Sequence, residues 1–229
     1  MWKSRTLEET TEIPQVDNGK MPWESMNAVH FPILPSDTPY GNMLLKGIDI
    51  VRRMDRVNKE IYRVYTSYVH PTEHDIYNRS QDLLEHQFYA EQVTYWLRKT
   101  ADELISLAFI IDEWSRTGTW PDVIKIDSIG SLNDKVPERL EQLFLPHKFF
   151  LSVLNEVTNA FKHSFINTDM TLLGPEYPVV FALSLKRNKL TGESKFYSID
   201  FRDVVEHFSI FYKDSIERVQ DWSKSSTSA

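Results

Sequence analysis

The sequence contains no cysteine, only seven glycines among its 229 residues, and no long apolar run. Without cysteine the chain forms no disulfide and offers no thiolate ligand to a metal ion. So few glycines leave little scope for the glycine-rich loops that hold nucleotide phosphates. The longest charge-free apolar stretch of the helical part, LISLAFII at 104–111, is far shorter than the roughly 20 residues of a transmembrane helix. These absences favour a globular protein of a reducing compartment that has no membrane partner.

Basic residues are the minority among the charged residues. The sequence has 26 of them against 33 acidic residues, which gives a net charge of −7. A surface of that overall sign does not attract nucleic acid, although a local basic patch remains compatible with it. The opening residues, MWKSRTLEETTEIPQ, lack the apolar segment of a secretory signal. We therefore expect a cytoplasmic protein.

The chain divides into three parts of different character. Residues 1–38 hold four prolines and show no helical period, which predicts an extended arm. Residues 39–222 predict one mainly helical domain, with a β-hairpin near 178–202 where apolar residues alternate along the chain. Residues 223–229, SKSSTSA, are small and polar and predict a disordered tail.

Two long helices are predicted in the first half of the domain. The first begins with Thr38 as its cap and Pro39 at its first position, and it ends before Pro71. The second begins around Thr72 and ends near Arg116, so a short turn joins two antiparallel helices. Seam residues of the first helix recur at spacings of four and three: Met43, Gly47, Ile50, Met54, Val57, Ile61, Val64 and Tyr68. Long helices of this kind also suit the joining of two copies into a homodimer.

A third helix, from about Pro146 to Phe165, carries the segment NEVTNAFKHSF. The hairpin follows it, and Asp203 and Glu206 are the expected caps of a last helix that ends at Trp222. The predicted fold class is therefore mainly α. It is a helical bundle with two long antiparallel helices, a motif-bearing third helix and a C-terminal β-hairpin plus helix.

Polar residues form a row on the third helix. Glu156, Asn159 and His163 follow one another at spacings of three and four, and Lys162 lies beside the last of them. One interpretation is an ordinary solvated helix face. The other is a site, because a carboxylate, an amide, an amine and an imidazole together bind phosphate or move a proton. These four residues are the candidate catalytic group, and both interpretations remain open.

The segment NEVTNAFKH resembles the N-box helix of GHKL-type histidine kinases, which reads like Asn-Glu-Leu-x-x-Asn-Ala-x-Lys-His. The resemblance implies that Glu156 and Asn159 hold magnesium and that Lys162 faces the nucleotide phosphates. Those kinases also need an Asp-x-Gly-x-Gly loop after the second strand. The equivalent stretch here, YSIDFRDVVEHF, contains no glycine. We therefore expect no cofactor, and a degenerate nucleotide-binding module ranks behind the two functions considered next.

The same helix resembles the motif helix of HEPN-type helical bundles, in which long antiparallel helices precede a helix bearing Arg-Asn-x-x-x-His. Asn159 and His163 match that motif, and Thr158 stands where the family has arginine. In RNase members the arginine stabilises charge on the phosphate and the histidine moves the proton. The resemblance implies a HEPN-like protein, a degenerate RNase relative that acts by binding RNA or a partner. The alternative is a non-catalytic dimeric scaffold, and whether the chain is an enzyme stays open.

Basic residues form a second row, on the first long helix, at spacings of four, three and four. Such a row suits contacts with nucleic-acid phosphates, whereas acidic residues three or four positions away offer ordinary surface ion pairs. The candidate nucleic-acid-binding residues are Arg52, Arg56, Lys59 and Arg63.

Two further features have simpler interpretations. His70 and His74 have the spacing of a metal pair, but Pro71 lies between them at a helix boundary, so we expect no metal site. The aromatic segment HQFYAEQVTYWLRK, residues 86–99, predicts packing at the edge of the bundle, with a partner or ligand surface as the alternative.

Overall fold

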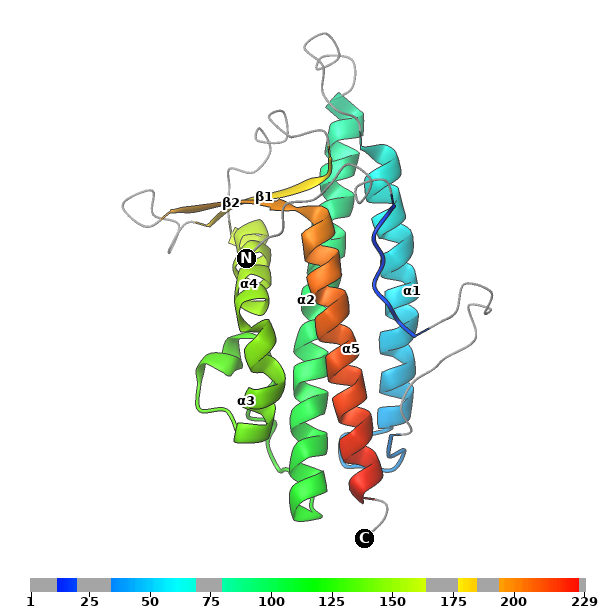
Figure 1. The fold of residues 1–229 in the computed structure, drawn as a ribbon, viewed down its shortest axis with the longest axis vertical. Helices are drawn as coiled ribbons and strands as arrows, with labels where there is room; N and C mark the ends of the chain where they lie inside the picture. Colours follow the sequence, from blue (N-terminus) through cyan, green and yellow to red (C-terminus); the bar gives the residue numbers. More distant parts are fainter. Residues whose placement is uncertain (1–11, 20–33, 69–79, 164–176, 185–193, 227–229) are drawn as a thin grey trace.

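Helix α2 (Ser80–Thr117) is the longest element and lies beside each of the other long helices (Figure 1). Helices α1 (Met43–Ser67) and α4 (Lys148–His163) flank it on opposite sides, and α5 (Phe201–Ser226) packs along it. The shorter elements are η2 (Gly130–Asn133), α3 (Glu138–Phe144), η3 (Leu145–His147), β1 (Val179–Ser184) and β2 (Lys195–Asp200). The mainly helical fold class with a hairpin and a final helix is confirmed.

The computed structural model describes residues 12–19, 34–68, 80–163, 177–184 and 194–226, without the side chains of 80–84, 163 and 225–226. Part of the predicted arm is therefore described. There Val16 is buried and its backbone N–H donates to Asn58 Oδ1 of α1 at 2.8 Å. The neighbouring N–H of Asp17 donates to Ser209 Oγ of α5 at 2.8 Å. This part of the arm therefore lies against α1 and α5.

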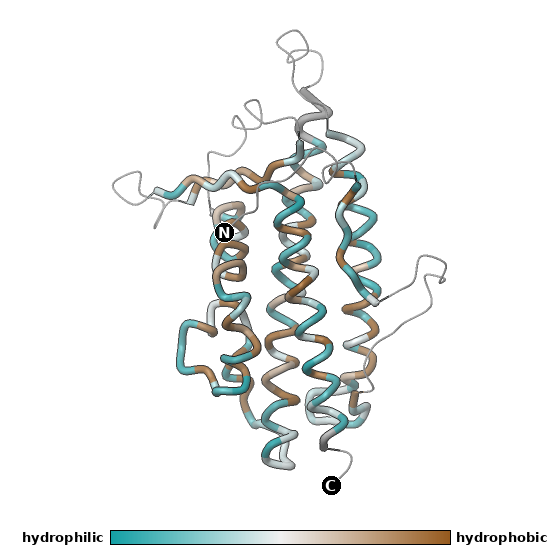
Figure 2. The backbone as a smooth tube through the Cα atoms, in the orientation of Figure 1, coloured by the Kyte–Doolittle hydropathy of each residue, from teal (hydrophilic) through white to brown (hydrophobic). Residues whose placement is uncertain are grey.

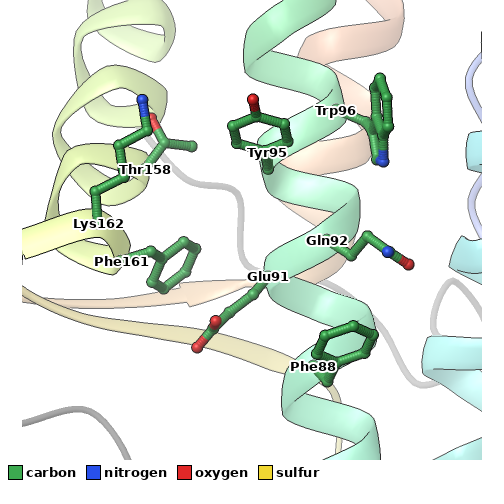
Figure 3. A pocket seen from close by; sticks show the side chains of 8 residues that line it. All are labelled: Phe88, Glu91, Gln92, Tyr95, Trp96, Thr158, Phe161 and Lys162. Atoms are coloured by element: carbon green, nitrogen blue, oxygen red, sulfur yellow. The ribbon is translucent and has the colours of Figure 1, made fainter.

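The helices are arranged as a layer with a cover on one side. Helices α4, α2 and α1 lie side by side, and α5 lies against one face of α2 (Figure 1). Figure 3 views α2 from the other face, with α5 behind it. Hydrophobic and hydrophilic segments alternate along each helix, as expected where one side of a helix is buried (Figure 2). The open face of α2 is therefore bordered by α4 and α1 and is not covered by α5.

The core is densest around the second half of α2, where neighbouring helices pack on several of its sides. From Ala101 to Ile111 most side chains are buried, and Ala101, Leu104 and Ile105 have no exposed surface. Helix α5 contributes the largest buried rings to this core: Phe201, Phe208 and Phe211. The seam predicted for α1 is also buried as far as Val64. Burial on this scale supplies most of the stability of such a bundle.

The ends of three helices differ from the sequence expectation. Helix α1 begins four residues later than predicted, because Asn42 Oδ1 accepts the Leu45 N–H at 3.0 Å and so is the cap. Thr38 serves a preceding turn instead, where its hydroxyl donates to the carbonyl of Gly41. At the start of α5, Asp200 Oδ1 accepts the Arg202 N–H at 2.8 Å, so neither Asp203 nor Glu206 is the cap residue.

The other two boundaries follow from short-range geometry. Helix α2 ends at Thr117, because the next residue, Gly118, has a φ of +71° and its N–H donates to the Trp114 carbonyl at 2.9 Å, which makes a left-handed helix end. Helix α5 continues to Ser226, so part of the segment predicted to be a disordered tail is helical. The predicted start of the second helix near Thr72 lies outside the described residues.

Strands β1 and β2 form an antiparallel hairpin over the end of α4 (Figure 1). Val180 pairs with Ile199 and Ala182 with Tyr197, and Val180, Ala182 and Ile199 are buried on the face toward the helices. Phe181 and Phe196 stack on the opposite face at 6.0 Å between ring centroids. The sequence pattern favours Val179, Phe181 and Leu183 as the apolar face of the first strand, and the structure buries the opposite face of β1. On β2 the predicted face is the inner one, and it places Tyr197 near α4.

Within the described part of the chain, no helix is both long enough and apolar enough to cross a membrane. The same residues contain no cluster of histidine and carboxylate side chains arranged to hold a metal ion. His70 and His74 lie outside the described residues, so their predicted role as part of a turn stays a prediction.

A buried histidine links α2 to the end of α1 and makes stability depend on pH. His86 is 2% exposed, and its Nδ1 donates to the Val64 carbonyl at 3.0 Å. Burial lowers the pKa of His86, and the bond to Val64 opposes that effect. A histidine whose pKa is lower in the folded state stabilises the fold above its unfolded pKa near 6.5, and that contribution is lost as pH falls through the folded pKa.

The His86→Asn variant is expected to lose less stability on acidification than the wild type. The asparagine amide keeps a donor for Val64 but does not titrate, and a single group changes stability by at most about 1.4 kcal/mol per pH unit. Thermal unfolding at about pH 7.5 and about pH 5.5 measures the difference for each protein. An equal fall in Tm for both proteins would contradict the assignment.

Candidate nucleic-acid interface

The polar row predicted on α4 does not converge on one point. Glu156 lies beside the hairpin, where Tyr197 donates a short hydrogen bond to its Oε2 and Lys195 Nζ lies 3.4 Å from the same oxygen. Burial first, and then the bond to the carboxylate, raise the pKa of the Tyr197 hydroxyl. The Glu156 carboxylate therefore joins α4 to β2, and we assign it a structural role.

The remaining described members of the row contact the neighbouring helix or another side chain of α4. Asn159 Nδ2 lies 3.4 Å from Asn155 Oδ1, a long contact within α4. Lys162 is exposed, and its ammonium lies 5.9 Å from the centre of the Tyr95 ring of α2. The side chain of His163 lies outside the described residues. The candidate catalytic group is therefore split between the hairpin side and the α2 side of α4.

Thr158, at the position of the HEPN arginine, is buried between α4 and α2. It is 1% exposed, and its hydroxyl donates to the Leu154 carbonyl at 2.8 Å. A guanidinium does reach this helix, but from α2: Arg98 donates to Asn155 Oδ1 at 3.3 Å and lies 3.3 Å from the Asp102 carboxylate. This arginine is engaged on both sides, so it does not restore the arginine position of the resemblance.

Lys162 borders a groove between α2 and α4 that has a volume of about 370 Å³ (Figure 3). Its walls are mainly aromatic: the Phe161 ring points into the groove from α4, and Tyr95 stands between the two helices in Figure 3. Glu91 directs its carboxylate toward α4 within the same groove. The lining residues are Phe88, Glu91, Gln92, Tyr95, Trp96, Thr158, Phe161 and Lys162.

A second groove, of about 560 Å³, lies on the other side of α2, against α1. Gln92 and Trp96 line both grooves, so the two grooves adjoin on the open face of α2. Its lining residues are Asp49, Arg52, Arg53, Arg56, Val57, Glu60, Gln92, Val93, Trp96 and Lys99. We call the surface formed by both grooves the aromatic face.

Positive charges lie directly beside the exposed rings of the aromatic face. Around Trp96, the Arg53 guanidinium lies 5.5 Å and the Lys99 ammonium 5.3 Å from the ring centre. Phe88 and Tyr95 are 60% and 43% exposed, which is high for aromatic side chains in a folded protein. Cations at these distances are attracted to the ring faces, and the Arg53 guanidinium is only partly exposed, because its side chain has 16% of its surface accessible. The aromatic face thus combines flat rings with cations over two adjoining grooves.

The basic row predicted on α1 contributes to this surface in part. Arg52 and Arg56 are exposed and line the α1–α2 groove, whereas Lys59 and Arg63 do not line it. Arg56 and Arg63 both pair with Glu60, at 3.0 and 2.9 Å. Glu60 is only 6% exposed, so these arginines are held in place by a buried carboxylate.

Arg53 was not a candidate from spacing, yet it is the residue that reaches Trp96. Its guanidinium pairs with Glu103 of α2 at 2.6 Å, rather than with Asp49 four positions earlier. The pKa of Glu103 is lowered despite burial, which alone would raise it, because Arg53 and Lys46 stabilise the charged form. The pair holds the Arg53 guanidinium beside the ring.

Most of the aromatic face was absent from the sequence-based site. The segment HQFYAEQVTYWLRK was expected to pack at the bundle edge, with a partner or ligand surface as the alternative. Tyr89 and Trp96 pack partly buried against the core, whereas Phe88 and Tyr95 are exposed. The available signal was the presence of four large rings among polar residues in one helix segment. What the sequence could not show is that α1 and α4 place Arg53 and Lys162 against those rings.

Comparison with known proteins finds no match: no protein-family model, no curated protein and no solved structure is similar to this chain.

Proposed function

We propose that this protein binds single-stranded nucleic acid across the aromatic face, with RNA as the ligand expected from the HEPN resemblance, and that it does not cleave it. The observation that carries the proposal is Trp96, whose ring has two cations within 5.5 Å of its centre and lines both the α2–α4 groove and the α1–α2 groove. Bases stack on such rings, and the phosphates next to a stacked base meet the cations. A duplex hides its bases, so exposed rings favour an unpaired strand.

Charge supports a local rather than a general affinity for nucleic acid. The chain as a whole carries −7, whereas five cations border or line the two grooves: Arg52, Arg53, Arg56, Lys99 and Lys162. Asp49, Glu60 and Glu91 lie in the same grooves and offset part of that charge. We therefore expect that few phosphate contacts contribute to the binding free energy and that stacking contributes a larger share.

The proposal omits cleavage because the candidate catalytic residues are placed apart. The Glu156 carboxylate is bonded to Tyr197, while Lys162 lies over Tyr95 on the other side of α4. Thr158 is buried and offers no charge to a phosphate. A general base and a cation must meet at one reacting atom to act together.

Trp96→Ala is expected to weaken binding of a single strand about tenfold, because stacking of one base contributes roughly 1–3 kcal/mol. Fluorescence anisotropy with labelled U-rich RNA and T-rich DNA of about ten nucleotides measures the Kd and distinguishes the two sources of the strand. For the wild type, about three phosphate contacts predict a slope near −2 for log K against log salt concentration.

Trp120→Ala is the matched control, because Trp120 stacks on Trp114 at 4.8 Å, away from the aromatic face. It should bind as the wild type does, once circular dichroism has shown that both variants are folded. Unchanged binding by Trp96→Ala would overturn the proposal. If neither the wild type nor Trp96→Ala bound nucleic acid, and sedimentation showed that the substitution changes the oligomeric state, the aromatic face would instead be assigned to a homodimer. That is the alternative scaffold function.

A further inference from the structure

The groove between α2 and α4 carries a feature that stacking alone does not require. Glu91 is a half-buried carboxylate within an aromatic hollow, flanked by Phe88, Tyr95 and Phe161. Burial raises the pKa of Glu91, and the hydrogen bond from Gln87 lowers it. A sequence-tolerant stacking surface gains nothing from a carboxylate there, since it repels the phosphates of the strand.

The hydrogen bonds of Glu91 leave acceptor capacity facing the groove. Gln87 Nε2 donates to Oε1 at 3.0 Å, and no other donor among the described residues reaches the carboxylate. A carboxylate accepts at about four lone-pair positions, so it can receive two parallel N–H donors from a planar ligand. Lys162 at the rim is placed to meet a phosphate while the ring of the same nucleotide enters.

We propose that this groove holds one base of the bound strand and selects guanine through Glu91. The inference rests on the proposed function. The Watson–Crick edge of guanine presents N1–H and the N2 amino group side by side, which matches two carboxylate oxygens. Adenine presents the N1 lone pair at the same place and would face the negative carboxylate. Uracil and cytosine are smaller and do not present two adjacent donors of this kind.

The walls of the groove fit a purine rather than a cation. An aromatic cage with a carboxylate also attracts ammonium groups. Here Lys162 already lies 5.9 Å from Tyr95, and Lys99 and Arg53 lie beside Trp96. Lys162 in this groove, together with Lys99 and Arg53 in the neighbouring groove, opposes entry of a further cation and favours a ligand that carries phosphate. A nucleotide can pair its base with the Glu91 carboxylate and its phosphate with the Lys162 ammonium.

The test compares U-rich RNA of about ten nucleotides containing one central guanine, adenine or inosine. The wild type should bind the guanine strand about tenfold more tightly than the adenine strand, as expected of a bidentate base contact. Inosine lacks the N2 amino group and should give an intermediate Kd. This comparison uses only the wild-type protein. Equal affinity for guanine and adenine strands would overturn guanine selection while leaving the proposed function intact, and absence of binding to every strand would overturn both.

Glu91→Gln should abolish the preference, because the amide can donate to N1 of adenine and no longer accepts two donors. The matched control is Glu85→Gln, which removes the same charge from an exposed position of α2. It should keep the ratio of the adenine and guanine Kd values. Loss of the preference in both variants would contradict a specific contact with Glu91 and assign the effect to net charge. Circular dichroism verifies that both variants are folded.

Discussion

Replacing Phe208 by alanine is expected to lower the free energy of unfolding by about 3–5 kcal/mol. Phe208 has no exposed surface and lies on the buried face of α5, the helix that packs along α2. Its ring lies 5.8 Å from Phe211 and 6.3 Å from Tyr212, which are themselves buried. Removing it leaves a cavity that the surrounding rings cannot fill without leaving their packed positions.

Urea unfolding followed by circular dichroism measures this change, and the Tm should fall by roughly 10 °C for a chain of this size. Ile210→Ala is the matched control on the same helix, since Ile210 is 57% exposed. It should alter stability by no more than about 0.5 kcal/mol. Equal effects of the two substitutions would show that α5 does not pack on α2 through this face.

Arg139→Met is expected to destabilise the protein by about 2 kcal/mol at neutral pH. Arg139 of α3 lies 3.1 Å from the Asp112 carboxylate of α2, which is 1% exposed. Removing the guanidinium leaves a buried charge, while the methionine keeps an apolar contact with the Trp222 ring beneath it. The cost is smaller than for a fully buried pair because the Arg139 side chain is 42% exposed.

The pH dependence distinguishes this electrostatic role from packing. Burial raises the pKa of Asp112, and the charge of Arg139 opposes that shift. A carboxyl with a raised folded-state pKa contributes stability that is fully present below its unfolded pKa and is lost as pH rises through the folded pKa. The deficit of Arg139→Met should therefore shrink as pH falls toward about 4. Thermal unfolding of both proteins at several pH values measures this deficit.

A double variant tests the same pair, and a variant of an exposed ion pair serves as the comparison. Asp112→Asn combined with Arg139→Met should recover most of the lost stability, because a neutral amide needs no cation. Lys195→Met breaks an exposed pair with Glu156 and should cost less than about 1 kcal/mol. A deficit of Arg139→Met that is constant with pH would contradict the assignment.

The helices of this protein were predictable because burial repeats along a helix. On α1 the spacing of Ile50, Met54, Val57 and Ile61 marks the face that is buried. Glu60 is buried beside them and was missed, because Arg56 and Arg63 neutralise it and spacing alone reports only apolar residues. The first cap was misplaced because Thr38 and Asn42 are both suitable residues, and only the observed turn decides between them.

The candidate site was less predictable because its contacts join distant segments. Spacing along α4 placed Glu156 and Lys162 in one polar group, but their partners come from other elements. Glu156 accepts a hydrogen bond from Tyr197 of the hairpin, and Lys162 lies beside the Tyr95 ring of α2. A pattern within one helix cannot show which neighbour stands on which side of it. Arg53, which links α1 to the aromatic face, is likewise positioned by its ion pair with Glu103 of α2.

The layered arrangement of α4, α2 and α1 has a consequence for the footprint of the protein on a long strand. Neighbouring helix axes are about 8–10 Å apart, so a strand crossing three helices spans only about 20 Å of surface. On the proposed function, each copy would occupy a few nucleotides, at the low end of the roughly 4–16 covered by other single-strand binders. A long RNA would then hold many copies in a row, and the density of copies along the strand would govern how completely it is covered.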